Sequence, residues 1–284
     1  MINPGDTPTF KIDVHQHFWN YDPEQYEWIS DDMEILRRDF LPVDLEHDRK
    51  DTEYKASICV QARQKRQETE WLLELAHYNP DLLGVVGWLD LCSQEFESDL
   101  RKYSDYRLLK GLRHVLHDEE DDGFMLRPEF IRGISSMEGS GLIYEILIFP
   151  RHIPNAIKLV EMFPRQEFVL DHCAKPDIRN GRINDWAEMI SRLAEYPNIS
   201  CKISGLVTEA DWTNWKPDDF YPYLEIIWNA FGEERLMIGS DWPVCLVAGT
   251  YPQVVCLAEG YFEQFGSGVV QKLTSSNAKR IYML

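Results

Sequence analysis

Two histidines, His15 and His17, stand one residue apart at the end of a short apolar run near the N-terminus, in the segment IDVHQH. Alternate residues of a β-strand point to the same face, so both imidazoles should lie on one side of a strand that ends here. Two converging nitrogen donors can hold a metal ion or face a shared acidic group. The pair therefore predicts a chemical site beside the end of this strand.

Other reactive side chains also stand at the ends of apolar runs. His172 lies near the end of EFVLDHC, and Asp241 ends RLMIGSD. A carboxylate at the end of a buried strand is costly unless it is paired or takes part in chemistry. We therefore favour a functional role for Asp241 over a purely structural one.

Basic and aromatic residues at the same strand ends are candidates for contacts with a substrate. They are Arg63, Arg113, His114, Lys175, Lys202 and Trp19. The arginines and lysines could instead form ion pairs with carboxylates, and Trp19 could pack within a loop rather than serve as a platform for a sugar face. Because successive strand residues alternate in direction, only one of Arg113 and His114 should face the site.

These side chains need a scaffold, and the chain shows eight short apolar runs separated by amphipathic stretches. The runs are residues 12–15, 56–62, 83–91, 108–116, 142–149, 167–173, 198–204 and 235–241. Helical spacing of apolar residues is clear in 69–78, 155–163, 186–196 and 223–231. The pattern predicts a single (β/α)₈ TIM barrel over residues 1–284, with its chemistry at the C-terminal ends of the strands.

A doubly wound open sheet is the alternative architecture, but no glycine-rich phosphate loop follows the first run. The longest connection, residues 18–54, is rich in aromatic and charged residues. We expect it to form an active-site loop followed by the first helix.

Composition narrows the classes of function. The net charge of −19 argues against binding to nucleic acid, which needs clustered Lys and Arg. No apolar stretch is long enough for a membrane span, and the start MINPGDTPTF lacks the pattern of a signal peptide, so we expect a cytoplasmic protein. The six scattered cysteines predict no disulfide framework.

Six blocks of sequence together resemble the amidohydrolase superfamily. They are IDVHQHFW, GLRHVLHDE, FVLDHCAKPDI, SCKISGLVTEADW, MIGSDWPVC and SSNAKRIYML, and they extend along almost the whole chain. More closely, they are similar to the branch that contains the sugar lactonases, the L-fuconolactone and L-rhamnonolactone hydrolases. The resemblance implies a (β/α)₈ barrel that hydrolyses the ring ester of a small sugar lactone.

The resemblance also implies the catalytic positions. These are His15, His17, His172 and Asp241, which would also be the ligands of a mononuclear metal site. In many relatives the equivalent residues bind zinc, which acidifies a water molecule and polarises a carbonyl. Two-metal relatives have a further histidine on the fifth strand and a bridging lysine or glutamate on the fourth, whereas here these strands end in EILIFPR and in Arg113 and His114. We therefore expect at most one zinc ion, and a metal-independent site remains open.

Hydrolysis of a lactone needs a base, a group that stabilises the oxyanion and a proton donor for the ring oxygen. Our hypothesis is that Asp241 takes the proton from water and later returns it. The three histidines would orient that water and stabilise the oxyanion, directly or through zinc. Arg113 or His114 would contact the carbonyl or a hydroxyl, and Arg63, Lys175 and Lys202 would bind hydroxyls or the product carboxylate.

Three other functions are open. A related barrel decarboxylates aromatic acids and would want a dedicated carboxylate-binding arginine and an essential metal. A hydrolase of dicarboxylate lactones should need a denser arginine cluster than the sequence offers. A non-catalytic ligand-binding barrel is the third possibility, but it would have no need to retain the HxH, DH and SD residues together.

Overall fold

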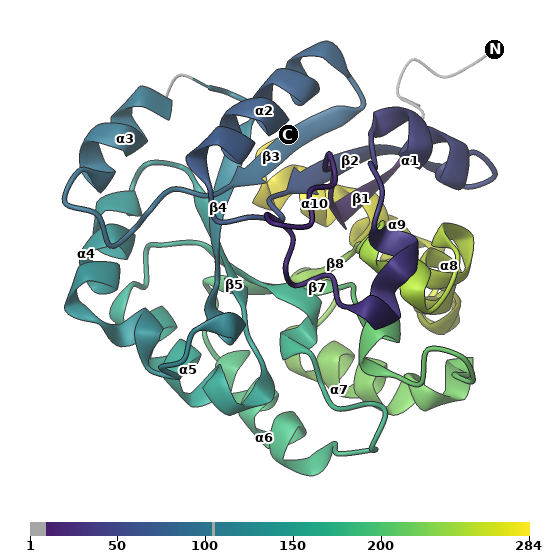
Figure 1. Cartoon of the computed structure of the whole chain (residues 1–284). Helices are drawn as coiled ribbons and strands as arrows, with labels where there is room; N and C mark the ends of the chain where they lie inside the picture. Colours follow the sequence, from purple (N-terminus) through teal and green to yellow (C-terminus); the bar gives the residue numbers. More distant parts are fainter. Residues whose placement is uncertain (1–9, 104–105) are drawn as a thin grey trace, which may run out of the picture.

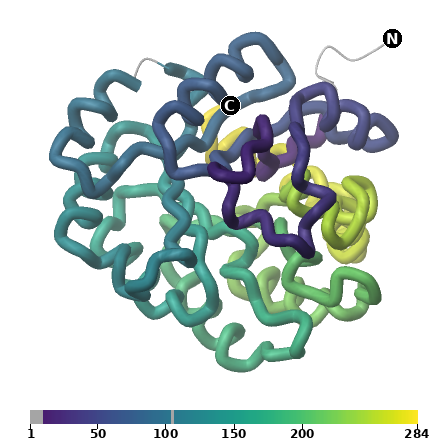
Figure 2. The backbone as a smooth tube through the Cα atoms, viewed as in Figure 1, coloured from purple at the N-terminus to yellow at the C-terminus, as the bar shows by residue number. Residues whose placement is uncertain are grey.

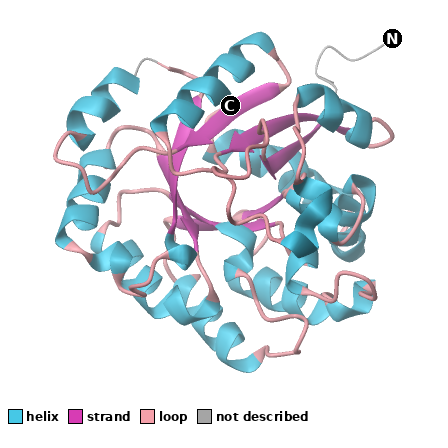
Figure 3. Ribbon diagram, in the orientation of Figure 1, coloured by secondary structure: helices cyan, strands magenta, loops and turns pink. Residues whose placement is uncertain are grey.

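Eight parallel strands form one sheet, in sequential order from β1 to β8, in the computed structural model of the chain (Figure 1). The structure describes residues 10–103 and 106–284. Helices lie outside the ring of strands (Figure 3). This arrangement confirms the predicted (β/α)₈ barrel.

The strands are β1 (Lys11–Gln16), β2 (Tyr54–Val60), β3 (Leu82–Gly87), β4 (Leu109–Val115), β5 (Ile143–Leu147), β6 (Phe168–Leu170), β7 (Ile199–Ile203) and β8 (Leu236–Ile238). The α-helices are α1 (Pro42–Arg49), α2 (Arg66–Tyr78), α3 (Phe96–Tyr103), α4 (Pro128–Met137), α5 (Ile153–Met162), α6 (Asn184–Leu193), α7 (Tyr221–Phe231), α8 (Tyr251–Phe262), α9 (Ser267–Gln271) and α10 (Asn277–Ile281). A π-helical turn, Lys272–Ser276, joins the last two helices.

The strands from β3 to β8 are all shorter than the apolar runs that predicted them, and in β6 and β8 the missing residues belong to the candidate site. β6 ends at Leu170 because His172 and the three residues after it have positive φ angles of 51–59°. β8 ends at Ile238, and Asp241 also has a positive φ, of 58°. A left-handed backbone cannot continue a strand, so these functional candidates lie on sharp turns just beyond the strands.

The strands separate two sets of buried apolar residues. One set packs under the helices, and it includes Tyr144 and Ile146 of β5. The other is smaller and includes Ile12, Ile143 and Val169, together with Tyr282 after α10. Neighbouring strand residues such as Ile143 and Tyr144 belong to different sets, as expected where side chains alternate between the barrel interior and the helix layer.

The ring closes between β1 and the turn after β8. The backbone N–H of Asp241 donates to the carbonyl of His15 at 2.8 Å. The buried carboxylate of Asp13 accepts hydrogen bonds from the Ser240 backbone N–H at 2.9 Å and from its hydroxyl at 2.6 Å. The first strand is thus fixed to the last by a carboxylate as well as by backbone bonds.

The long connection after β1 contains a 3₁₀ turn, Asp31–Leu36, followed by α1. Trp19 and Phe40 pair through two backbone hydrogen bonds of 3.0 and 2.9 Å across this connection. β1 runs beside the C-terminal helical turns (Figure 2), and just before this strand the Phe10 ring centre lies 5.2 Å from the Lys279 ammonium.

No helix among the described residues is long and apolar enough to cross a membrane. The expectation of a cytoplasmic protein rests partly on the N-terminal stretch MINPGDTPTF. Residues 1–9 of that stretch lie outside the described part of the chain. All six cysteines are free, as predicted.

Candidate active site

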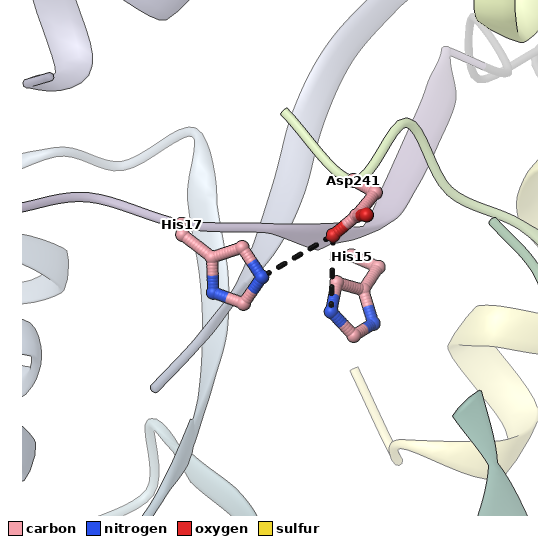
Figure 4. A group of neighbouring side chains, drawn as sticks. All are labelled: His15, His17 and Asp241. Carbon is pink, nitrogen blue, oxygen red and sulfur yellow. Dashed lines mark ion pairs between the residues drawn. The ribbon is translucent and has the colours of Figure 1, made fainter. Parts of the chain in front are cut away.

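One carboxylate oxygen, Oδ1 of Asp241, faces three histidine side chains. It lies 3.4 Å from Nε2 of His17, 3.7 Å from Nε2 of His15 and 3.8 Å from Nε2 of His172. Figure 4 shows the two histidines of the HxH pair pointing toward Asp241. The structure therefore brings together the four residues that the sequence proposed as the catalytic centre.

Local backbone geometry positions two of these groups. His172 begins the left-handed turn after β6, with φ of 52° and ψ of 32°, and its Nδ1 lies 2.8 Å from the Ser204 hydroxyl. Gly205, also with a positive φ, comes so close that an added Cβ would lie 2.6 Å from His172 Nδ1 and 3.1 Å from Asp241 Oδ2. Only glycine, which has no side chain, leaves room for His172 and Asp241 at this position in the turn after β7.

Burial and neighbouring charges set the ionisation of the site. Burial acts to raise the pKa of Asp241, but His172 and His17 lower it more, and the pKa is below its ordinary value. The pKa of His172 lies well below its ordinary value, chiefly because of burial. Burial and then the positive charge of Lys202 do the same to the pKa of His15. The arrangement combines the ionised carboxylate of Asp241 with the neutral imidazoles of His15 and His172.

A second acidic group, Asp171, lies on the other side of His15. Its Oδ1 is 3.5 Å from His15 Nδ1, and its Oδ2 accepts from Arg113 Nη1 at 3.0 Å. Lys202 Nζ is 3.3 Å from both Asp171 Oδ1 and His15 Nδ1, and Arg113 Nη1 is 3.2 Å from His15 Nε2. Two cations therefore already neutralise Asp171 and face both ring nitrogens of His15.

Two groups among the described residues could hold a metal ion. They are His15–His17–Asp241 and His15–Asp171–His172, and the ligand atoms of each lie within 4.8 Å of one another. Imidazole nitrogens with one carboxylate are a donor set that zinc accepts, and neutral imidazoles are the form that ligates. The first group fits the ion better because Arg113 and Lys202 already neutralise the carboxylate of Asp171 through ion pairs.

A cavity of about 650 Å³ opens above these residues. His17, Arg113, His172, Lys175 and Asp241 contribute to its wall. Its rim carries aromatic, aliphatic and acidic side chains from the connection after β1 and from the turns after β7 and β8, including Trp28, Met33, Glu209, Trp212 and Val244. The volume and the mixed lining suit a small polar ligand.

Two further cations of the cavity wall, Lys175 and Arg63, are both paired. Lys175 Nζ lies 2.5 Å from Glu209 Oε1. Arg63 Nε donates to the buried carboxylate of Glu68 at 3.3 Å, and its guanidinium also donates to the side chain of Gln25 in the connection after β1. The ion pairs proposed from the sequence are therefore present for both residues, and both side chains also line the cavity.

Three predicted substrate-binding residues do not reach the cavity. Trp19 is fully buried against Tyr26 and Phe40. His114 faces the helix layer, where its ring stacks on Phe124, because strand alternation directs Arg113 inward. Lys202 is fully buried in the barrel interior, with Nζ 2.6 Å from Glu145 Oε2. A direct contact with substrate is inconsistent with these three positions.

Sequence reasoning assigned no role to three residues of this region. Asp171 was visible beside His172, and Glu145 stood out as a charge within the apolar run LIYEILIF, so both carried a signal. Gly205 carried none, because its importance comes from a close approach between distant turns.

Comparisons with known proteins agree with this architecture. The sequence pattern of the family described as Amidohydrolase matches residues 12–284. A Burkholderia multivorans protein named L-fucono-1,5-lactonase is 37% identical over 285 residues, which cover 96% of this chain and 96% of the relative. A Burkholderia ambifaria protein of the same name is 36% identical over 245 residues, or 86% of this chain and 83% of the relative.

A similar structure has also been solved. The crystal structure of an amidohydrolase from Burkholderia multivorans with bound zinc superposes with a TM-score of 0.93 at 36% identity, and the match covers 97% of this chain and 99% of that one. The family pattern spans nearly the whole barrel, and it includes the four grouped side chains, His15, His17, His172 and Asp241. This chain is a member of the amidohydrolase family.

Proposed function

We propose that this protein is a lactonase that hydrolyses the ring ester of an aldonolactone, with L-fuconolactone and L-rhamnonolactone as the first substrates to test. The observation that carries the proposal is the buried Asp241 carboxylate, which faces three imidazoles at the wall of a cavity. Two relatives named L-fucono-1,5-lactonase, at 36–37% identity, support the choice of sugar.

Asp241 acts as the general base. Its lowered pKa keeps it ionised near neutral pH, and it lies in the cavity wall, where a water molecule can reach it. It accepts the proton of the attacking water and returns it to the ring oxygen as the ester bond breaks. His17 and His172, also in the wall, hold the water and the carbonyl oxygen in position.

Positive side chains stabilise the negative charge that develops. Arg113 points into the cavity and is held by Asp171, so its guanidinium is fixed before the substrate arrives. Lys175, held by Glu209, lies in the wall as well. Fixed charges of this kind stabilise an oxyanion without reorganising during the reaction. Arg63, in the turn after β2, contacts Gln25 of the connection after β1 and binds substrate hydroxyls.

His15, His17 and Asp241 are the residues that would hold a zinc ion, with His172 next to them. When bound, zinc supplies polarisation of the carbonyl and a more acidic water. We propose one ion at most, since the guanidinium of Arg113 and the ammonium of Lys202 already neutralise Asp171.

The paired arginines disfavour substrates with free carboxylates. Arg63 and Arg113 are the arginines among the described residues of the cavity wall, and each already contacts a carboxylate, Glu68 or Asp171. A dicarboxylate lactone or an aromatic acid would need an arginine with an open hydrogen-bonding edge. We therefore propose a neutral sugar lactone.

The decisive experiment is a pH-indicator assay of the purified protein on L-fucono-, L-rhamnono-, L-galactono- and D-glucono-lactones, with and without chelator. Acid release from one or more of these sugars is expected, and the zinc content of each sample is measured in parallel. No acid release from any of them, with zinc restored, would refute the lactonase assignment. Loss of activity with chelator and recovery with zinc would establish the metal requirement.

Asp241→Asn should lower kcat about 10²–10⁴-fold, since an amide cannot accept the proton. The fold should survive, because Asn also adopts the positive φ of 58° found at this position. The measurements are kcat on the preferred lactone and the melting temperature. Near-normal turnover by a folded variant would remove Asp241 from the role of base, and ligand binding by a wild-type protein without turnover would favour the non-catalytic barrel.

A further inference from the structure

A layer of buried ionic side chains fills the barrel beneath the cavity. Glu145 of β5, Asp171 after β6 and Lys202 of β7 are all fully buried, and none of them lines the cavity. His15, which is equally buried, lies between this layer and Asp241. Charges withdrawn this far from water are costly unless each is paired with a well-placed partner.

Lys202 is the centre of this layer. Its ammonium nitrogen lies 2.6 Å from Glu145 Oε2, 3.3 Å from Asp171 Oδ1 and 3.3 Å from His15 Nδ1. The contacts with Glu145 and His15 have hydrogen-bond geometry, whereas the contact with Asp171 is an ion pair. The position of Glu145 therefore controls how the ammonium is shared between Asp171 and His15.

The other oxygen of Glu145 is held from below. Its Oε1 accepts a hydrogen bond of 2.5 Å from the hydroxyl of Tyr282, the residue after α10. Among the described residues, no other donor bonds to that oxygen. The Tyr282 ring is buried among Ile12, Ile143 and other apolar residues at the lower end of the barrel interior.

We propose that Tyr282 is a positioning residue for the active site, acting through Glu145 and Lys202 on His15. With both oxygens of Glu145 committed to different donors, the carboxylate cannot turn, and Lys202 stays where it also faces His15 and Asp171. Without the tyrosine hydroxyl, both oxygens turn toward Lys202, which draws the ammonium away from His15. Small displacements of catalytic groups are enough to lower turnover severalfold or more.

Tyr282→Phe tests this link because it deletes one oxygen and keeps the ring that packs at the lower end of the barrel. Tyr54→Phe is the matched control, since Tyr54 is also fully buried and its hydroxyl faces Glu259 rather than Glu145. Glu145→Gln tests the same link at its second member and does not disturb the packing of Tyr282.

Two readouts are needed. The first is the ring ¹H–¹⁵N NMR spectrum of the histidine-labelled protein at fixed pH, in which the signals of His15 are those missing from His15→Gln. The second is kcat and KM on a lactone, which rests on the proposed function. Tyr282→Phe and Glu145→Gln should both shift the His15 signals, and Tyr282→Phe should lower kcat about tenfold with KM changed less than about twofold. Tyr54→Phe should do neither.

The NMR result decides the positioning role whatever the enzyme hydrolyses. If the His15 signals of Tyr282→Phe match those of the wild type, the proposal is wrong. Shifted His15 signals in a wild-type protein that hydrolyses no lactone would support the positioning role and refute the lactonase assignment separately. Equal kcat values for Tyr282→Phe and Tyr54→Phe on an active enzyme would also overturn the proposal.

Discussion

Gly205 has no functional group, yet it lies between two catalytic candidates. An added Cβ would be 2.6 Å from His172 Nδ1 and 3.1 Å from Asp241 Oδ2, and its φ is 62°. His172 Nε2 and Asp241 Oδ1 face each other at 3.8 Å, and Gly205 borders the other nitrogen of the ring and the other oxygen of the carboxylate. At the scale of the residue, the site is thus shaped by a missing side chain as well as by its charged ones.

Gly205→Ala should lower kcat at least about tenfold, because the methyl group must displace His172 or Asp241. Gly181→Ala is the matched control, since Gly181 also has a positive φ, of 65°, with nothing within 4 Å of an added Cβ. Both variants carry a backbone cost of about 1–2 kcal/mol for a side chain at positive φ. Kinetics and melting temperatures of the pair would separate the two effects, and equal activity would contradict the role given to Gly205.

At the scale of the element, the junction between β2 and α2 holds a buried acid beneath the cavity. Glu68 of α2 accepts hydrogen bonds from the backbone N–H groups of Ala62 and Arg63, and it also pairs with the Arg63 side chain. Burial raises its pKa to about 7, although these partners oppose the shift. The position of Arg63 in the cavity wall thus depends on Glu68, which is buried in the first turn of α2.

Glu68→Gln should change the pH dependence of stability. The folded protein keeps the proton of Glu68 up to about pH 7, whereas the unfolded chain releases it near 4.5. The folded state therefore binds more protons in this window, and wild-type stability falls as pH rises through it. The free energy of unfolding of Glu68→Gln, relative to wild type, should rise by up to about 3 kcal/mol between pH 4.5 and 8.

Denaturant titrations at several pH values would measure this difference, with Glu74→Gln on the exposed face of the same helix as the control. A difference between Glu68→Gln and wild type that stays constant with pH would contradict the buried, proton-holding carboxylate.

At the scale of the whole molecule, the barrel depends on a seam between its first and last strands. Asp13 is fully buried and accepts hydrogen bonds from the Ser240 backbone and hydroxyl and from the backbone N–H of His15. The same seam carries His15 and Asp241 on its two sides. Closure of the fold and assembly of the site are therefore one event.

Asp13→Ala should lower the free energy of unfolding by about 3 kcal/mol or more, because it leaves several buried donors without an acceptor. Asp39→Ala is the control, since exposed Asp39 accepts one backbone hydrogen bond, from Tyr21, and its loss should cost about 1 kcal/mol or less. Chemical denaturation of both variants measures the difference. Equal stability of the two would show that the seam does not depend on Asp13.

Local pattern alone predicted the parts of this protein that depend on near neighbours in the chain. The two-residue period of a β-strand predicted that His15 and His17 face the same side, and both do lie near the Asp241 carboxylate. The alternation of apolar runs with stretches of helical spacing predicted the barrel. The ends of those runs also marked His172 and Asp241, because polar groups at the ends of buried strands stand out from their surroundings.

Only the tertiary structure decided what depends on register and on close approach between distant segments. Arg113 points into the cavity, whereas His114 points toward the helices. A shift of the strand register by one residue would reverse these two directions. The space beside Gly205 and the bond from Tyr282 to Glu145 join residues that are 33 to 137 positions apart. The linear pattern holds no signal for such contacts, because they exist only once the barrel has closed.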